Sequence, residues 1–192
     1  PIMVHPNDPE RLSLEEILAE LRAGDLLTHC FHGMAGGVLN NEGHVRDSVK
    51  RAIDAGILLD LGHGAGSFDF DVAEQALAEG VIPHTISSDL HVYNLHGPVF
   101  DLATTMSKFL LLGLNLPGII HRCTAAPAEI IGMEGEIGTL QPGAQADLAI
   151  FKFDSGPHTF VDSHGKTRHG DQRLIPANVI RAGREIRAVA RS

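Results

Sequence analysis

The chain has 192 residues, a hydrophobic fraction of 43% and a formal net charge of −9. This apolar content is sufficient for a globular core, whereas the negative charge and the lack of a Lys- or Arg-rich run argue against nucleic acid or an anionic membrane surface as a partner. No apolar run is long enough to span a bilayer. We therefore expect a small-molecule substrate, and the presence of only two cysteines indicates a reducing compartment, the cytoplasm.

Strands and helices alternate through the first part of the sequence. Aliphatic and β-branched runs predict strands, and stretches with one apolar face predict helices, which begin at caps such as Ser13 and end at glycines such as Gly56. The predicted strands are 1–6, 25–31, 57–61 and 82–88, and the predicted helices are 13–22, 43–55, 70–79 and 99–112. Four such repeats indicate parallel strands that are joined by right-handed crossovers.

Each of the four predicted strands ends in a residue that is capable of chemistry. His5, His29 and His63 close the strand-like segments 2–5, 26–29 and 58–63, and Asp89 directly follows the fourth strand. The carboxyl ends of parallel strands meet at one edge, so we expect these side chains to face a common site. An aspartate that emerges from a core is costly unless a positive group meets it. The pattern therefore predicts a cation or a basic group close to Asp89.

The character of the sequence changes after residue 137. The elements predicted around and beyond this point are two short helices at 117–122 and 126–131, a strand at 146–153, a polar hairpin at 154–171 and a strand pair at 179–186. We expect a domain boundary near Gly138, with one domain at 1–137 and a second at 138–192.

Two α/β architectures are compatible with four strand-helix repeats, a doubly wound sheet and a (β/α)8 TIM barrel. The doubly wound sheet usually carries a G-x-G-x-x-G phosphate loop, and the segment 62–66 (GHGAG) matches this pattern only weakly because an imidazole lies inside it. Ligand-type residues at every strand end favour the barrel. Because a complete barrel has eight strands and about 250 residues, four strands would make half of one.

Several motifs together resemble one family. They are PIMVH at 1–5, THCFHG at 28–33, LDLGHG at 59–64, SSDLH at 87–91, PAEIIG at 127–132 and GTLQPGAQADLA at 138–149. In this order they are similar to the C-terminal half of the amidohydrolase superfamily, within its dihydroorotase-like deacetylases and aminoacylases. The resemblance implies barrel strands five to eight, followed by part of a small β-sandwich, and the last motif is the most specific of the set.

The resemblance also implies a metal-dependent hydrolase. In the family, one or two divalent metals, most often zinc, activate a hydroxide that attacks an amide or ester carbonyl. His5 and His29 resemble metal ligands, and Asp89 resembles both a ligand and the catalytic proton acceptor. His63 and His91 match no metal position, so they are assigned, with Gly64, to substrate binding or to the orientation of ligands. The family's His-x-His pair and its bridging lysine are absent from this sequence.

Three hypotheses for function stay open. The first is a metal-dependent amidohydrolase for an N-acyl, O-acyl or cyclic amide compound, with this chain as an inactive fragment of it. The second is a non-catalytic scaffold subunit, and the third is a deaminase with a ring substrate. A half-barrel that pairs with a second copy is the alternative to a fragment. Since the strands beginning near Pro1 and Ile82 would have unpaired edges, we expect a homo-oligomer or aggregation.

Overall fold

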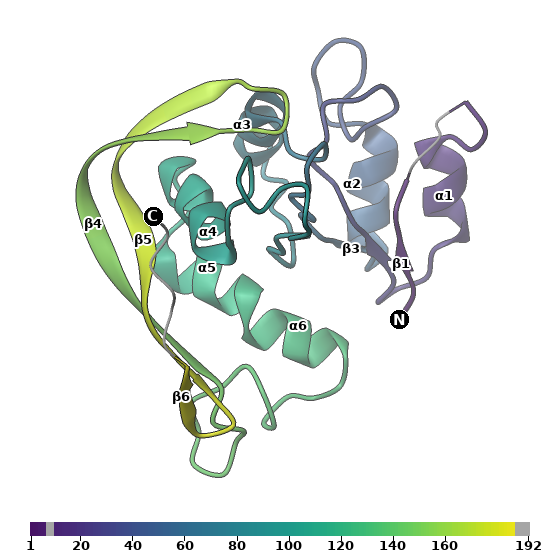
Figure 1. Cartoon of the computed structure of the whole chain (residues 1–192). Helices are drawn as coiled ribbons and strands as arrows, with labels where there is room; N and C mark the ends of the chain where they lie inside the picture. Colours follow the sequence, from purple (N-terminus) through teal and green to yellow (C-terminus); the bar gives the residue numbers. More distant parts are fainter. Residues whose placement is uncertain (7–9, 187–192) are drawn as a thin grey trace. The chain divides into compact units, whose positions relative to one another are not determined.

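Short parallel strands and helices alternate through the first unit of a computed structural model, which describes residues 1–6 and 10–186 (Figure 1). Contacts along the chain define two compact units. The first contains residues 1–102 and 161–167, and the second contains residues 103–160 and those from 168 onward. The segment 161–167 thus belongs to the first unit, although the strands that flank it extend through the second.

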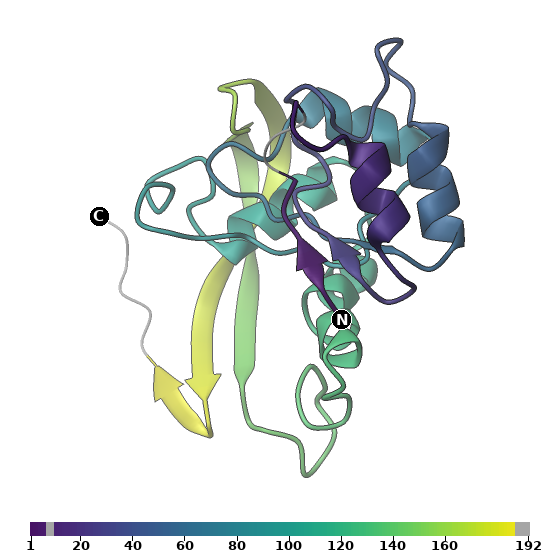
Figure 2. The ribbon, with the colours of Figure 1, turned by 90° about the vertical axis from the view of Figure 1, so that its right-hand side faces the viewer.

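The sheet of the first unit consists of β1 (Met3–Val4), β2 (Leu26–Leu27) and β3 (Leu58–Leu59) in the order β1-β2-β3. Both strand pairs are parallel, as the sequence predicts, and β1 and β2 run side by side in Figure 2. The carboxylate of Asp25 holds the start of this sheet, because it accepts hydrogen bonds from the backbone N–H groups of Ile2 (2.8 Å) and Arg22 (3.0 Å). Adjacent parallel strands place the residues that follow them at one edge.

The predicted fourth strand is present only as an extended segment beside β3. It forms a single parallel bridge, between Asp60 and Thr85, although its backbone also accepts hydrogen bonds from Leu61 and His63. The ladder is interrupted because the backbone N–H of Leu59 donates to Nδ1 of His84 (3.0 Å) instead of to a carbonyl. The prediction of a regular strand was therefore wrong, but the segment lies where the fourth strand was expected.

The described part of the first unit contains three helices, α1 (Leu14–Glu20), α2 (Asp47–Asp54) and α3 (Phe70–Ala78), and side-chain caps mark the start of two of them, α1 and α3. Ser13 and Glu16 form a capping box at the start of α1, and the Asp69 carboxylate caps α3 by accepting from the N–H groups of Asp71 and Val72. Figure 1 shows α1 and α2 side by side.

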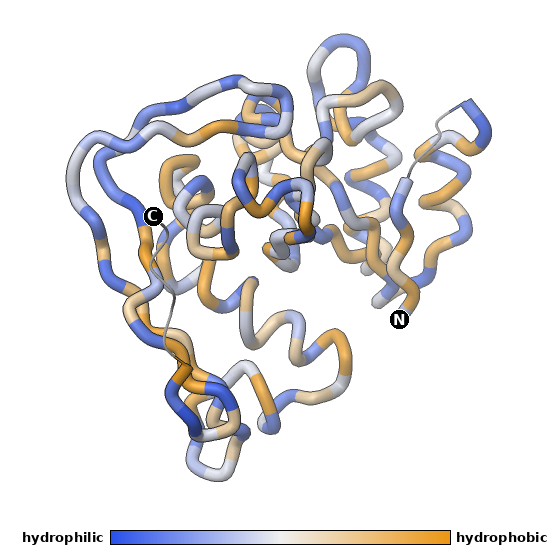
Figure 3. Tube along the Cα trace, in the orientation of Figure 1, coloured by the Kyte–Doolittle hydropathy of each residue, from blue (hydrophilic) through white to orange (hydrophobic). Residues whose placement is uncertain are grey.

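The core of the first unit consists of aliphatic and aromatic side chains from these elements and the loops between them. Its large, fully buried side chains include Leu27, Phe31, Val49, Leu59, Leu61, Phe68 and Phe70. The strand residues are coloured as hydrophobic in Figure 3. At the edge of the sheet, Ile2 and Met3 are more than half exposed (53% and 55%), and Ile82 is 37% exposed. The edge strand β1 therefore leaves apolar side chains open, which agrees with the predicted unpaired edge.

The second unit combines helices with a long three-stranded sheet of order β4-β5-β6. Its elements are α4 (Leu102–Leu111), α5 (Leu116–Cys123), α6 (Ala125–Ile130), β4 (Leu148–Val161), β5 (Thr167–Arg181) and β6 (Arg184–Ile186). The β5–β6 pair is antiparallel around Gly183, as predicted. Strands β4 and β5 are much longer than the predicted strand at 146–153, because they absorb most of the expected polar hairpin.

The predicted boundary near Gly138 does not coincide with the division into compact units, which places α4 with the long sheet. One reason is a direct contact, since the Ser107 hydroxyl of α4 accepts a 2.8 Å hydrogen bond from the backbone N–H of Leu174 in β5. Residues 187–192 of the predicted second domain lie outside the described residues. Within residues 1–6 and 10–186, no helix has the length and apolar character needed to cross a membrane.

Candidate active site at the strand ends

His5 and His29 follow neighbouring strands and are in direct contact. Their ring centroids lie 4.1 Å apart, with an interplanar angle of 64°. His29 is buried, whereas His5 is exposed, so the pair connects the core to the surface. The backbone of His29 has a φ of 59°, a conformation that is unfavourable for a non-glycine residue and that often marks functional sites. The structure therefore brings together the two histidines that were predicted as metal ligands.

The orientation of the His29 ring is set by a single hydrogen bond. Its Nδ1 lies 2.6 Å from the carbonyl oxygen of Gly62, which can only accept, so Nδ1 carries the proton. Nε2 is then the only ring nitrogen left to bind a cation, as is usual for metal-binding histidines. Gly62 is required here because a Cβ atom at this position would lie 2.6 Å from Nδ1 of His29 and 2.4 Å from the Thr28 hydroxyl.

Asp89 is exposed and has a φ of 45°. The buried Asn94 supports this conformation, since its side-chain amide donates a 2.9 Å hydrogen bond to the Asp89 carbonyl. Gly64 approaches the carboxylate closely, and a Cβ atom on Gly64 would lie 2.8 Å from Oδ2. The predicted catalytic aspartate is thus held by a neighbouring loop on one side and by its own loop on the other.

Electrostatic interactions connect the site residues. Partial burial and the nearby His29 lower the pKa of His5, and Asp89 opposes this shift. Burial also lowers the pKa of His32, with His29 and His5 as further causes. His164 is a further cause of the same lowering. Imidazole nitrogens next to a carboxylate form a donor set that suits a divalent cation.

A buried hydroxyl network lies behind these residues, in the layer of the strands. The carboxylate of Asp60 accepts hydrogen bonds from the hydroxyls of Thr28 (2.6 Å), Thr85 (2.5 Å) and Ser87 (2.8 Å). This network joins β2, β3 and the extended fourth segment. Cys30 points into the same interior, where burial and Asp60 raise the pKa of its thiol. A thiol with a raised pKa is a poor nucleophile, so Cys30 has a packing role.

His63, His91 and Gly64, which were assigned to substrate binding or to the orientation of ligands, differ in burial and in their contacts. His63 is fully buried, packs against Phe68 with ring centroids 4.6 Å apart, and directs Nδ1 at the Gly64 carbonyl (3.0 Å). This burial favours an orienting role over direct substrate contact. His91 is exposed and contacts Tyr93, with ring centroids 5.8 Å apart. Gly64 lies against the Asp89 carboxylate.

Two histidines near the site were not assigned from the sequence. His32 is buried and its Nδ1 accepts a hydrogen bond from the backbone N–H of Met34, and His164 belongs to the turn between β4 and β5. The motif THCFHG contains His32, which offered a signal for its position. No local signal indicated that His164 lies near a site formed more than seventy residues earlier in the chain.

The fit of a metal ion to these residues is partial. The chemistry of His5, His29 and Asp89 suits a divalent cation, and the hydrogen bond at Nδ1 of His29 leaves Nε2 available to bind it. Among residues 1–6 and 10–186, however, no group of three or more His, Cys, Asp or Glu side chains is arranged to hold a metal ion. A metal ion at this position would therefore need at least one further ligand.

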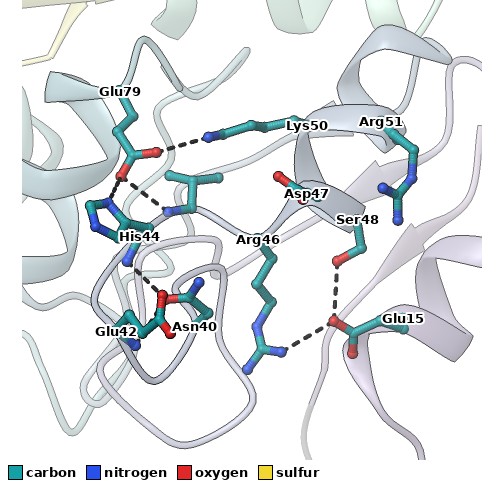
Figure 4. A pocket seen from close by; sticks show the side chains of 11 residues that line it. Glu15, Asn40, Glu42, His44, Arg46, Asp47, Ser48, Lys50, Arg51 and Glu79 are labelled. Carbon is teal, nitrogen blue, oxygen red and sulfur yellow. Dashed lines mark hydrogen bonds and ion pairs between the residues drawn. The ribbon is translucent and has the colours of Figure 1, made fainter.

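A polar surface pocket of about 470 Å³ lies elsewhere on the first unit, along α2 and the loop before it (Figure 4). Figure 4 shows Glu79 bound to Lys50 (2.9 Å) and His44 (3.1 Å), and Glu15 bound to Arg46 (3.2 Å). These pairs already neutralise both carboxylates. None of the predicted site residues lines this pocket, so the strand ends are the better candidate for chemistry.

Comparisons with known proteins show which proteins this chain is similar to. A family model described as a deacetylase-like composite domain matches residues 140–184. Over 185 residues the chain is 42% identical to a protein of Enterococcus faecalis that is named a deacetylase, and the match covers 95% of this chain but 50% of that protein.

Solved structures give a similar result. A crystal structure of an adenine deaminase matches with a TM-score of 0.92 and 41% identity over 97% of this chain and 50% of that chain. A crystal structure of a dihydroorotase matches with a TM-score of 0.86 and 36% identity over 98% of this chain and 48% of that chain. The chain therefore spans about half the length of the proteins that it matches.

Proposed function

Because this chain belongs to the amidohydrolase superfamily, we propose that it forms half of a metal-dependent hydrolase, the half that carries the metal ligands His5 and His29 and the catalytic Asp89. The contact between the two histidine rings, next to Asp89 at the ends of neighbouring strands, is the observation that carries the proposal. The mixed α/β fold, which matches barrel proteins of this superfamily over half their length, supports it. In this proposal the first unit supplies barrel strands five to eight, and the long sheet is part of a small β-sandwich.

The proposed reaction is the hydrolysis of a carbon-nitrogen bond in an acylated small molecule, or of the corresponding ester. The deacetylase name of the Enterococcus faecalis relative supports a deacetylase or aminoacylase type of reaction, and the dihydroorotase neighbour supports a cyclic amide as an alternative substrate. When bound, a divalent cation, most often zinc in such sites, lowers the pKa of a water molecule and polarises a carbonyl group.

The chain's own residues then have distinct roles. His29 would hold the cation through Nε2, because the Gly62 carbonyl occupies Nδ1, and His5 would hold it from the exposed side. Asp89 accepts the proton of the attacking water while the new carbon-oxygen bond forms. It returns that proton to the leaving nitrogen as the carbon-nitrogen bond breaks. The exposed position of Asp89 gives substrate access to its carboxylate.

A second candidate function is deamination, which the adenine deaminase structure favours with the highest TM-score of the matches described above. In that reaction the same aspartate would transfer a proton to a leaving amine on a ring. A third candidate, a non-catalytic scaffold, is favoured by the lack of a complete ligand group among residues 1–6 and 10–186. The three candidates predict different metal contents and different products.

The experiment that separates them uses the full-length protein. Metal is removed with a chelator and zinc is added back, while acetate release from N-acetyl amino acids and O-acetyl esters is measured alongside ammonia release from adenine. We expect acetate release that chelation abolishes and zinc restores. Activity that survives exhaustive chelation would overturn the metal-dependent mechanism. Ammonia release with one metal per chain would favour the deaminase, and a protein without metal or activity would favour the scaffold.

We also propose that the residues of this chain alone hydrolyse nothing, because they supply too few ligands to retain a metal ion. The exposed apolar residues at the β1 edge support self-association of such a chain. A cytoplasmic location is proposed from the two free cysteines, Cys30 and Cys123.

A further inference from the structure

The turn between β4 and β5, residues 162–166, belongs to the first unit and lies next to the start of α3 (Figure 1). Asp162, which is only 2% exposed, anchors this turn. Its Oδ2 accepts a hydrogen bond from the backbone N–H of Phe70 (3.1 Å), and its Oδ1 accepts from the N–H groups of His164 (2.8 Å) and Lys166 (2.9 Å). One buried carboxylate thus shapes the turn and attaches it to α3.

Lys166 attaches the other side of the turn. Its ammonium group donates to both carboxylate oxygens of Asp69, at 2.9 and 2.8 Å, and to Asp71 at 2.6 Å. Because Asp69 also caps α3, this contact holds the end of the loop that leads from β3 to α3. The turn therefore holds the β3–α3 loop at a point just before the helix.

Ser163 connects the turn to the same loop nearer the strand end. Its backbone N–H donates to the Phe68 carbonyl (3.0 Å), and its hydroxyl accepts from the Phe68 N–H (3.3 Å). A hydroxyl has a single hydrogen to donate, and here that hydrogen goes to the Gly64 carbonyl (3.2 Å). The side chain of Ser163 therefore uses both its donor and an acceptor site on one loop.

Gly64 connects the Ser163 hydroxyl to Asp89, the proposed catalytic residue. Its N–H donates to the carbonyl of Ser88 (3.1 Å), the residue before Asp89, and its φ of 54° is one that glycine tolerates. A Cβ atom here would lie 2.8 Å from Oδ2 of Asp89. The backbone of Gly64 thus lies between the Ser163 hydroxyl and the Asp89 carboxylate.

We propose that the β4–β5 turn is part of the active site and that Ser163 is a positioning residue, which fixes the Gly64 backbone and thereby the Asp89 carboxylate. The expected effect on turnover rests on the proposed function. The hydrogen-bonded connection between Ser163 and Gly64 does not, because amide exchange measures it separately. It assigns a role in catalysis to a segment that the fold otherwise uses as a connection between two sheet strands.

The test compares three variants of the full-length protein, S163A, S163T and S155A. Thr retains the hydroxyl of Ser163, and the exposed Ser155 in β4 provides the same Ser→Ala change away from the turn. Hydrogen exchange is measured at the Phe68 and Gly64 amides, and kcat and KM are measured for an N-acetyl amino acid. In S163A we expect exchange at both amides to rise, and kcat to fall, by about three- to tenfold with KM unchanged.

In S163T and S155A we expect amide exchange rates and a kcat that equal those of the parent. Unchanged exchange at the Phe68 or Gly64 amide of S163A would overturn the proposal whether or not the protein is active. Faster exchange with an unchanged kcat would overturn the link to Asp89. A parent protein with no hydrolytic activity would instead contradict the proposed function, and faster exchange at Gly64 would then still support the connection from the turn to the site.

Discussion

The carboxylate of Asp60 accepts a 2.5 Å hydrogen bond from the hydroxyl of Thr85, on the extended segment that replaces a fourth strand. Thr28 and Ser87 donate to the same carboxylate, so a single buried side chain joins three neighbouring segments directly behind the candidate site. The same segment also forms backbone hydrogen bonds with residues 59–64, so the side-chain bonds to Asp60 add to its attachment. The buried Asp60 therefore helps to hold the segment that leads into Asp89.

Replacing Asp60 with Ala should lower the free energy of unfolding by about 2–4 kcal/mol, because two buried hydroxyls and the half-buried Ser87 hydroxyl would lose their acceptor. Asp60→Asn should cost less, since its amide oxygen still accepts. Denaturant unfolding of the full-length protein measures both changes. As a control, the exposed Asp54 at the end of α2 is changed to Ala, with an expected effect within about 0.5 kcal/mol. Equal effects of Asp60→Ala and Asp54→Ala would contradict the role of the network.

Gly62→Ala should weaken metal binding about 10- to 100-fold, because the added Cβ would displace the His29 ring from the Gly62 carbonyl that orients it. Chelator competition with the full-length protein measures this change. Gly66→Ala in the same loop is the matched control, since a Cβ there meets no atom within 4 Å. Parent-like metal affinity in Gly62→Ala would show that the orientation of His29 is unimportant for binding.

Asp89→Asn should reduce kcat by about 10²- to 10⁴-fold while at least one metal ion stays bound. The amide can still offer an oxygen to a cation but cannot accept the proton of the attacking water. Steady-state kinetics and metal analysis of the full-length protein, with circular dichroism to verify folding, check both parts. The same change at the exposed Asp171 of β5 is expected to be silent. A folded Asp89→Asn variant with unaltered kcat would assign proton transfer to another group.

Acid should destabilise the protein partly through Glu79. The Lys50 ammonium, with Gln75 and His44 as further hydrogen-bond donors, lowers the pKa of Glu79 from 4.5 to about 2. A depressed folded-state pKa contributes stability that is complete above pH 4.5 and is lost as the pH falls towards 2. Glu79→Gln should therefore flatten the fall in denaturant midpoint across this window. The exposed Glu20 of α1, changed to Gln, should leave the fall unaltered, and parallel profiles for all three proteins would refute the assignment.

The alternation of strands and helices could be predicted because its signals are local. The N-cap at Ser13 and the start of α3 at Phe70 were both predicted from short stretches of sequence. The fourth strand was not regular, because the His84 imidazole takes the place of a backbone acceptor for Leu59. Strand propensity alone cannot predict that a side chain replaces a backbone acceptor in the hydrogen-bond ladder between two strands.

Part of the candidate site could also be predicted, because residues that follow parallel strands share an edge. His5, His29, His63 and Asp89 were expected at one edge on that ground, and the family resemblance then assigned metal ligation to His5, His29 and Asp89. The first two lie in contact in the structure. His63 was expected near substrate or near the ligands, and its complete burial against Phe68 depends on packing that strand alternation does not reveal.

By itself, the sequence determined the order of the elements, the residues at the strand ends and the resemblance that suggested their chemistry, because hydrophobic period, capping and short motifs act over a few residues. Only the tertiary structure decided that the Gly62 carbonyl orients His29 and that the Ser163 hydroxyl binds Gly64, 99 positions away in the chain. Such contacts follow from the path of the folded backbone. A hydrogen bond between distant segments forms only when packing brings donor and acceptor within about 3 Å, and no local pattern encodes that approach.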